Sequence, residues 1–232
     1  EVKKTASKKP VETKKKDGVK SSAKKTAPKK TTKSSTKKTT TNKREKIDRQ
    51  ADILTQESKR PEKVVRIKVV GIGGGGGNIV TRMGQDNLIR GVEFVAINTD
   101  VQDLDYSGAK KKVHIGRTIT RGMGAGMDPE LGRKSAEENK EDIKDAIKEA
   151  DVIFLTAGFG GGTGTGATPI VAEVARELGI LTVGVVTKPF TFEGPARSKL
   201  AEEGIENLRN KVDTLLTISN DKIFDVIDEN TP

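Results

Sequence analysis

Residues 160–166 form the heptapeptide Gly160-Gly161-Gly162-Thr163-Gly164-Thr165-Gly166, the most glycine-rich motif that also carries threonines. Five glycines in seven residues carry a large cost in conformational entropy, which is usually tolerated where a backbone must approach a ligand closely. The apolar segment Asp151 to Thr156 precedes it and predicts a buried strand. After it, apolar residues recur at helical spacing from about Thr168-Pro169, which predicts a helix packed against a sheet.

A strand, a glycine-threonine loop and a helix in this order predict an anion-binding site. The N-terminus of a helix presents unpaired N–H groups and a partial positive charge. Thr163 and Thr165 add hydroxyl donors that a plain turn does not need. We therefore expect this loop to hold phosphate, and the alternative is a tight turn that binds nothing.

A second glycine-rich segment follows the first expected strand, Val64 to Val70. It runs from Gly71 to Asn78, and we expect a helix from Ile79 to about Leu88. The segment satisfies G-x-G-x-x-G, and its position between a strand and a helix is typical of the opening unit of a nucleotide-binding domain.

The rest of the chain alternates between expected strands and helices. A long helix should begin at Asp128-Pro129, where Asp caps the helix and Pro occupies its first position. Polar residues follow the second strand, at the edge where open parallel sheets bind ligands. We expect an α/β fold of Rossmann-like type, a mostly parallel sheet with helices on both faces. The further strands are expected at 92–98, 112–115, 180–187 and 212–219, and the further helices at 128–150, 197–210 and 220–227, with a glycine-containing loop at 116–127.

Three glycine-rich loops exceed what one dinucleotide pyrophosphate needs. They favour a nucleotide with a longer phosphate tail, held by backbone N–H groups, hydroxyls and Mg²⁺, because no Walker lysine follows either glycine run. The alternative is a nicotinamide-dependent oxidoreductase, which would leave Gly160 to Gly166 without a role. The chain has no cysteine, and its single histidine, His114, is expected to be an ordinary surface or edge residue.

The positive charge is confined to the first part of the chain. Residues 1–60 hold 21 Lys and Arg against 7 Asp and Glu, a net charge of +14, whereas the remainder carries −4. Residues 1–61 form a Lys, Ser, Thr and Ala-rich tail and linker that we expect to be disordered, because it has too little apolar surface to offset the entropy of ordering. Such a tail could bind anionic lipid or nucleic acid, keep the protein in solution, or act as a transit peptide. We expect one domain over residues 62–232.

No apolar run approaches the roughly 20 residues that a membrane-spanning helix needs, and no signal peptide is visible. We expect no transmembrane segment and a cytoplasmic protein.

Five segments together resemble one known family. Gly160 to Gly166 matches the GGGTGTG signature of the tubulin/FtsZ superfamily. The order and spacing of four other segments, 73–78, 98–100, 120–126 and 190–194, are similar to those of the bacterial FtsZ branch. The similarity covers about Val64 to Pro232.

The resemblance implies a GTPase that polymerises head to tail into the ring that divides the cell at its middle. It implies GTP or GDP as ligand, Mg²⁺ as cofactor, and division-ring proteins as partners of regions absent here. The implied nucleotide contacts are Gly74, Gly75, Gly76, Gly77 and Asn78 on the phosphate and base side, Gly162, Thr163, Gly164 and Thr165 around the phosphates, Asn98, Asp100, Gly122, Gly124, Ala125 and Gly126 near the terminal phosphate, Glu193 and Arg197 at the ribose and phosphates, and Asn220 at the guanine.

The resemblance assigns no catalytic residue to this chain. In the family, a loop beyond the position of Pro232 carries the acids that activate water, and it acts on the neighbouring subunit's nucleotide. We therefore expect nucleotide binding and little turnover from these residues alone. From the residues themselves, Glu193 and Arg197 could equally be an i, i+4 ion pair. Asn220 with Asp221 could equally cap the last helix.

Overall fold

A computed structural model of the chain describes residues 64–85 and 89–226. The tail and linker predicted for residues 1–61 lie outside this part, as do the expected helix ends at Leu88 and Ile227. The boundary between residues 61 and 62 stays a prediction.

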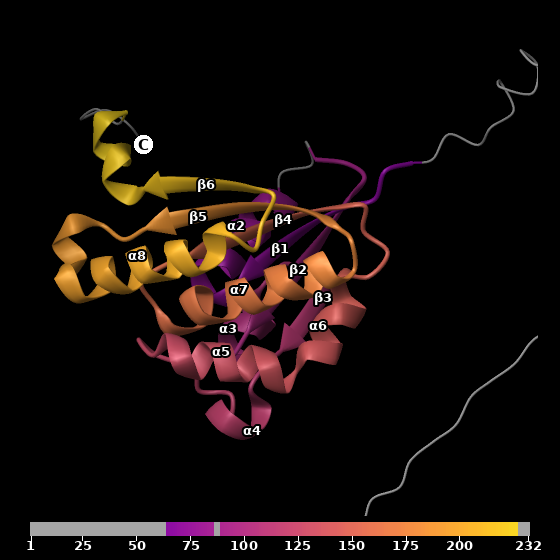
Figure 1. Cartoon of the computed structure of the whole chain (residues 1–232), viewed down its shortest axis with the longest axis horizontal. Helices are drawn as coiled ribbons and strands as arrows, with labels where there is room; N and C mark the ends of the chain where they lie inside the picture. The colour runs from indigo at the N-terminus through magenta and orange to yellow at the C-terminus, as the bar shows by residue number, and fades with distance from the viewer. Residues whose placement is uncertain (1–63, 86–88, 227–232) are drawn as a thin grey trace, which may run out of the picture. The chain divides into compact units, whose positions relative to one another are not determined.

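Six parallel strands form one sheet in the order β3-β2-β1-β4-β5-β6 (Figure 1). Each strand pairs in parallel with its neighbours, so the predicted mostly parallel sheet is confirmed. The strands are β1 (Ile67–Ile72), β2 (Val92–Asn98), β3 (Lys111–His114), β4 (Val152–Gly158), β5 (Leu181–Lys188) and β6 (Thr214–Ser219).

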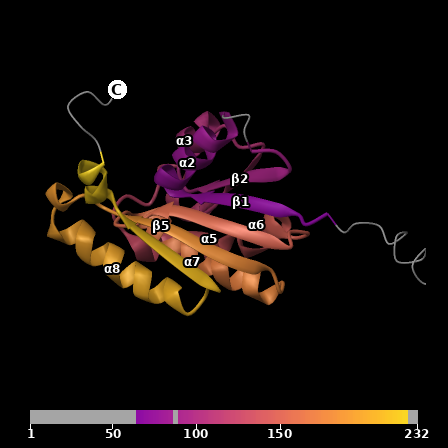
Figure 2. The ribbon, with the colours of Figure 1, turned by 90° about the horizontal axis from the view of Figure 1, so that it is seen from above.

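Helices cover both faces of the sheet, which confirms the second half of the fold prediction. Figure 2 shows α2 and α3 on one side of the sheet and α5, α7 and α8 on the other. The helices are α2 (Gly73–Gln85), α3 (Val101–Tyr106), α4 (Arg117–Thr120), α5 (Pro129–Glu138), α6 (Lys140–Ile147), α7 (Gly162–Glu177) and α8 (Pro195–Arg209), with 3-10 turns η1 (Thr191–Glu193) and η2 (Asn220–Asp225).

The two faces of the sheet bury different amounts of apolar surface. The larger core packs alternate residues of β1, β2 and β4, such as Val70, Ile97 and Leu155, against α5 to α8. The smaller core packs Val69 and Ala96 against α2 and α3. The alternation follows from the pleat of a strand, which sends successive side chains to opposite faces. No described helix of the chain is long and apolar enough to cross a membrane.

Both glycine-rich helices begin earlier than expected. α2 begins at Gly73, not at Ile79, because its glycines allow the helix to press directly on the sheet: a Cβ on Gly76 would lie 2.4 Å from the carbonyl oxygen of Thr156. α7 begins at Gly162, so Pro169 lies inside the helix. Pro169 has no N–H to donate, and the neighbouring Thr168 hydroxyl donates to the carbonyl of Gly164 at 2.5 Å.

The single helix expected over 128–150 is wrong, because the chain forms α5 and α6 with a break at Asn139. The Asn139 side chain accepts from the N–H of Gly116 at 2.8 Å and donates to Asp142 at 2.8 Å, so it ties the preceding loop to this break. The expected start of α5 is confirmed: Asp128 caps the N–H groups of Glu130 and Leu131, and Pro129 is the first helical residue.

Candidate nucleotide-binding site

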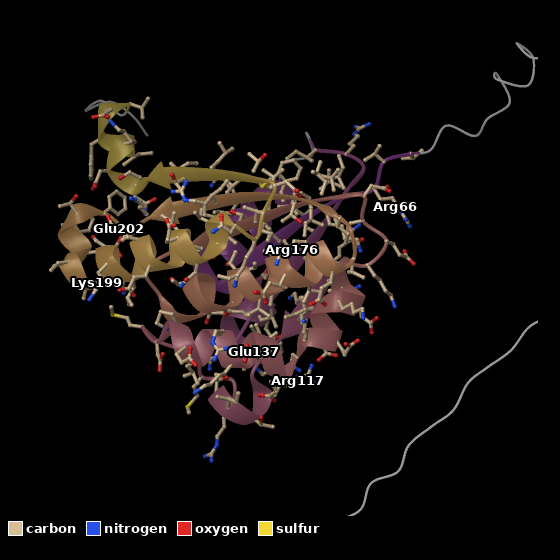
Figure 3. All side chains as sticks on the ribbon, in the orientation of Figure 1. Arg66, Arg117, Glu137, Arg176, Lys199 and Glu202 are labelled. Carbon is tan, nitrogen blue, oxygen red and sulfur yellow. The ribbon has the colours of Figure 1, made fainter. Side chains whose placement is uncertain are left out.

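A polar cavity of about 330 Å³ lies at the carboxyl ends of β1, β4 and β5. This is the end of the sheet opposite to Arg66, which Figure 3 labels just before β1. Its walls come from the starts of α2, α7, α8 and η2. The lining residues are Gly73, Gly74, Gly75, Gly126, Gly158, Phe159, Gly161, Gly162, Thr163, Gly164, Thr187, Pro189, Glu193, Arg197 and Asn220.

The first turn of α7 supplies unpaired donors to this cavity. No side chain caps the helix at Gly161, and the N–H of Gly162 donates to the carbonyl of Gly126 at 2.7 Å. Among the described residues, none accepts a hydrogen bond from the N–H of Thr163 or Gly164. A 16-residue helix with free N–H groups at its start favours an anion there.

The two glycine-rich segments touch each other at the cavity. Gly73 has a φ of +70°, and a Cβ at this position would lie 2.9 Å from the backbone nitrogen of Gly164. A Cβ on Gly164 would in turn lie 2.4 Å from the carbonyl oxygen of Gly158. Glycine therefore lets the starts of α2 and α7 meet without a side chain between them.

The loop Gly122 to Gly126 is tied to the end of β2 and to α7. The N–H of Gly124 donates to the carbonyl of Thr99 at 3.3 Å, and the N–H of Val101 donates to the carbonyl of Gly122 at 3.1 Å. The bond from Gly162 to Gly126 joins the loop to the glycine-threonine helix.

The side chains of Asn98 and Asp100 shape the turn after β2. Asn98 Oδ1 accepts from the N–H of Thr99 at 2.8 Å and of Asp100 at 3.3 Å. The Asp100 carboxylate caps α3 by accepting from Gln102 and Asp103 at 2.9 and 3.2 Å. Both side chains thus accept hydrogen bonds from backbone N–H groups in this structure.

Glu193 and Arg197 form the ion pair that the i, i+4 interpretation expected, and both also line the cavity. Arg197 Nη1 donates to Glu193 Oε2 at 2.5 Å, and Glu193 Oε1 accepts from the N–H of Phe190 at 3.0 Å. The pair therefore fixes the turn η1 at the cavity rim.

Asn220 lines the cavity at the start of η2, whose N-terminal cap is Ser219 and carries no side-chain cap bond. The capping interpretation of Asn220 is therefore wrong. Its neighbour Asp221 instead accepts from the hydroxyl and the N–H of Thr191 at 2.7 and 3.0 Å. These bonds lower the pKa of Asp221 and join η2 to η1.

The predicted nucleotide contacts divide into three groups. Those on the cavity wall are Gly74, Gly75, Gly126, Gly162, Thr163, Gly164, Glu193, Arg197 and Asn220. Those on an adjoining cavity of about 80 Å³ between α2 and α3, which shares Gly73 and Gly74, are Gly77, Asn78 and Asn98. Those on neither wall are Gly76, Asp100, Gly122, Gly124, Ala125 and Thr165.

Two residues of the third group support the site without lining either cavity. Gly76 is buried on the side of α2 that packs against the sheet. The Thr165 hydroxyl accepts from the N–H of Gly160 at 2.9 Å and holds the glycine-threonine turn.

Four residues of the cavity wall lie outside the predicted motifs and contacts, namely Gly158, Phe159, Thr187 and Pro189, whereas Gly73 and Gly161 lie in the two predicted glycine-rich segments without having been assigned a contact. Gly158 and Thr187 lie at the carboxyl ends of β4 and β5. Gly158 lies two residues beyond the expected end of its strand, and Thr187 is the expected end of its strand. The rule that ligands bind at the carboxyl ends of parallel strands was the signal that could have found them.

His114 ends the edge strand β3, as expected for an edge residue, and its Nε2 is buried with no hydrogen-bond partner among residues 64–85 and 89–226. The described residues contain no group of three or more His, Cys, Asp or Glu side chains that could hold a metal ion.

The comparisons with known proteins agree with this geometry. Residues 66–228 match the family model described as Tubulin/FtsZ family, GTPase domain. An empty FtsZ dimer from M. jannaschii is 45% identical, with a TM-score of 0.70 over 79% of this chain and 52% of that chain. CetZ2 from Haloferax volcanii, solved as a protofilament bound to GTPγS, is 25% identical, with a TM-score of 0.65 over 72% of this chain and 52% of that chain. CetZ1 from the same organism, a GDP-bound monomer, is 27% identical, with a TM-score of 0.62 over 72% and 54% of the two chains.

This chain spans about half the length of each of these structures. The family match covers all six strands of the sheet, and the glycine-rich turns and the cavity also lie within the matched residues. The resemblance inferred from the motifs is confirmed: the chain belongs to the Tubulin/FtsZ family and carries its GTPase domain.

Proposed function

We propose that this chain binds GTP and GDP in the cavity at the carboxyl ends of β1, β4 and β5. The observation that carries the proposal is the uncapped start of α7, where Thr163 and Gly164 line a polar cavity and their N–H groups make no hydrogen bond within the described residues. Phosphate oxygens accept such hydrogen bonds, and the helix dipole favours their negative charge.

The two ends of the cavity suit the two ends of a guanine nucleotide. The starts of α2 and α7 offer backbone donors for phosphates, and Arg197 adds a cation at the rim. Asn220 offers an amide that both donates and accepts, which suits the polar edge of a guanine. Glu193 can accept from ribose hydroxyls, in line with the roles that the family resemblance implies.

Mg²⁺ would be held chiefly by the nucleotide's own phosphates. The described residues provide no cluster of acids, and Mg²⁺ in nucleotide sites is commonly bound through phosphates, water and one or two carboxylates. When bound, it would neutralise phosphate charge beside α7.

For the whole protein we propose GTP hydrolysis coupled to head-to-tail polymerisation in a division ring at the middle of the cell. The FtsZ dimer and the CetZ2 protofilament among the similar structures support self-association. The acids that activate water belong, by the family resemblance, to a loop that lies beyond these residues and acts on the neighbouring subunit. Purified alone, this chain should bind nucleotide and show little or no turnover.

The test is equilibrium binding of GTP, GDP, ATP and NAD⁺ to the 232-residue chain, with and without Mg²⁺. We expect guanine nucleotides to bind selectively. Thr163→Val should weaken their binding by about 10- to 100-fold, the usual size of a lost hydrogen bond to a charged group. The matched control is Thr182→Val, which removes the hydroxyl of another buried threonine, near the start of β5 and away from the cavity. Binding of NAD⁺ or ATP as tight as that of GTP would contradict guanine selectivity.

The basic tail supports a second, separate role. Its net charge of +14 over residues 1–60 favours attraction to a polyanion such as nucleic acid or to anionic lipid. The same preparation tests it: salt-sensitive binding to DNA or to anionic vesicles should disappear in a version starting at Glu62, while GTP binding survives. Equal binding by both versions would assign the effect to the folded domain.

A further inference from the structure

Two threonine hydroxyls meet at the base of the nucleotide cavity. Thr99 Oγ1 lies 2.6 Å from Thr163 Oγ1, and this contact joins the end of β2 to the first turn of α7. Thr163 lines the cavity, whereas Thr99 is fully buried and does not. Among the described residues neither hydroxyl makes another hydrogen bond through its oxygen.

A bound phosphate would fix the direction of this hydrogen bond. A hydroxyl has one proton to donate, and phosphate oxygens at neutral pH only accept. If the Thr163 hydroxyl donates to phosphate, it must accept from Thr99. The result is a short chain in which Thr99 donates to Thr163 and Thr163 donates to phosphate, and such chains strengthen each bond by polarisation.

The backbone holds Thr99 in position for this task. Its N–H donates to Asn98 Oδ1 at 2.8 Å. Its carbonyl accepts from the N–H of Gly124 and from the hydroxyl of Thr120, each at 3.3 Å. Thr99 is therefore fixed by the strand end on one side and by the loop Gly122 to Gly126 on the other.

We propose that Thr99 is a positioning residue of the nucleotide site, which acts on phosphate only through the Thr163 hydroxyl. The inference rests on the proposed function, because it needs a phosphate in the cavity. It adds to that function the residue that sets the donor direction of Thr163, and it explains why a polar side chain is fully buried behind the cavity wall.

The test is a double-mutant cycle on the full 232-residue chain, with equilibrium binding of GDP and of a non-hydrolysable GTP analogue. Thr99→Val keeps the branched shape and removes only the hydroxyl, and Thr163→Val does the same at the cavity wall. We expect about three- to tenfold weaker binding from Thr99→Val, the scale of a hydrogen bond between neutral groups, and about 10- to 100-fold weaker binding from Thr163→Val, the scale of a hydrogen bond to a charged group. The double variant should bind no more weakly than Thr163→Val alone, because the two losses are one chain of bonds.

Two further variants separate positioning from structure. Thr99→Ser restores the hydroxyl and should recover binding to within about twofold of the unmodified chain. Thr182→Val should bind nucleotide as the unmodified chain does, since the Thr182 hydroxyl donates to the carbonyl of Ile180 at 3.0 Å, near the start of β5 and away from the cavity. Should Thr99→Val lack a cooperative unfolding transition, Thr99→Ala takes its place in the cycle.

Each outcome decides the inference. Losses that add in the double variant, or Thr99→Val binding like the unmodified chain, would overturn it while leaving the proposed function intact. Failure of the unmodified chain to bind either nucleotide would overturn the proposed function and this inference together.

Discussion

Neighbouring glycines of α2 have different roles that the sequence alone does not distinguish. Gly76 is buried, and a Cβ there would lie 2.4 Å from the carbonyl oxygen of Thr156 and 2.9 Å from the carbonyl carbon of Gly71. Gly77 is next in the chain, yet a Cβ there would meet nothing within 4 Å. One glycine sets the distance between helix and sheet, and the other is free to carry a side chain.

This difference predicts opposite effects of the same substitution. Gly76→Ala should destabilise the fold by about 1–3 kcal/mol, because the methyl group overlaps backbone that cannot yield. Gly77→Ala should stabilise it by about 0.5–1 kcal/mol, because alanine loses less entropy in a helix. Chemical denaturation of the two variants measures both, and a loss of stability in Gly77→Ala comparable to that in Gly76→Ala would contradict the packing argument.

For single residues, the sequence motifs predicted the candidate site only in part. The spacing of glycine and threonine placed Gly162, Thr163 and Gly164 at a phosphate-binding turn, and these residues line the cavity. A glycine pattern cannot say whether a glycine faces a ligand or a packed backbone, since both need the missing side chain. Thr99 escaped the prediction because its role depends on a contact 64 residues away in the chain.

Among the elements, α5 and α7 are joined through glycines at the base of the site. A Cβ on Gly132 of α5 would lie 2.4 Å from the carbonyl oxygen of Gly162, and a Cβ on Gly166 of α7 would lie closer still to the carbonyl oxygen of Pro129. The start of α7, and with it the free N–H groups, is therefore positioned by its contact with α5.

We predict that Gly132→Ala affects both folding and binding. The added methyl group should push α5 away from Gly162, lower the free energy of unfolding by about 1–3 kcal/mol and weaken nucleotide binding. The matched control is Gly84→Ala on α2, where a Cβ would have ordinary contact with Phe94 at 3.9 Å. Unfolding and GDP-binding measurements on both variants check this, and unchanged binding in Gly132→Ala would show that α7 does not depend on α5 for its position.

The exposed face of α5 carries an ion-pair network with a measurable pKa effect. Arg133 donates to both oxygens of Glu130, at 2.8 and 2.6 Å, and it also pairs with Glu137, which Figure 3 labels on the outer side of the helix. The hydrogen bond from Arg133 lowers the pKa of Glu130 from 4.5 to about 2. A carboxyl whose pKa falls on folding stabilises the folded state above its unfolded pKa, and this contribution is lost as the pH falls from 4.5 towards 2.

Arg133→Gln should therefore return the pKa of Glu130 towards 4.5 and reduce the loss of stability in this pH range. A ¹³C NMR titration of the Glu130 carboxyl measures the shift directly. Lys199→Gln on α8 removes a charge that pairs with Glu203 and should leave the pKa of Glu130 unchanged. An unaltered Glu130 pKa in Arg133→Gln would mean that the pair does not persist in solution.

Across the whole molecule, the order of the elements was predictable and their exact ends were not. Hydrophobic runs and helical periodicity predicted the alternation of strands and helices, which requires parallel strands and helices on both faces. The break at Asn139 escaped prediction because both halves are equally helical in pattern, and a distant loop decides where the helix ends. The elements together bring residues from Gly73 to Asn220 to one cavity, so the stability of the molecule and ligand binding should be linked.

This linkage gives a prediction for the folded domain as a unit. A ligand that binds only the folded state at 100 times its Kd adds about 2.7 kcal/mol of stability, which for a domain of this size raises Tm by about 5–10 °C. GDP should produce this shift equally in the full chain and in a version starting at Glu62, because the described residues that line the cavity all lie at Gly73 or later. At the same nucleotide concentration Thr163→Val should show a smaller shift, since its Kd is higher. Differential scanning calorimetry measures all three, and a shift that vanishes in the version starting at Glu62 would contradict binding by the described cavity residues alone.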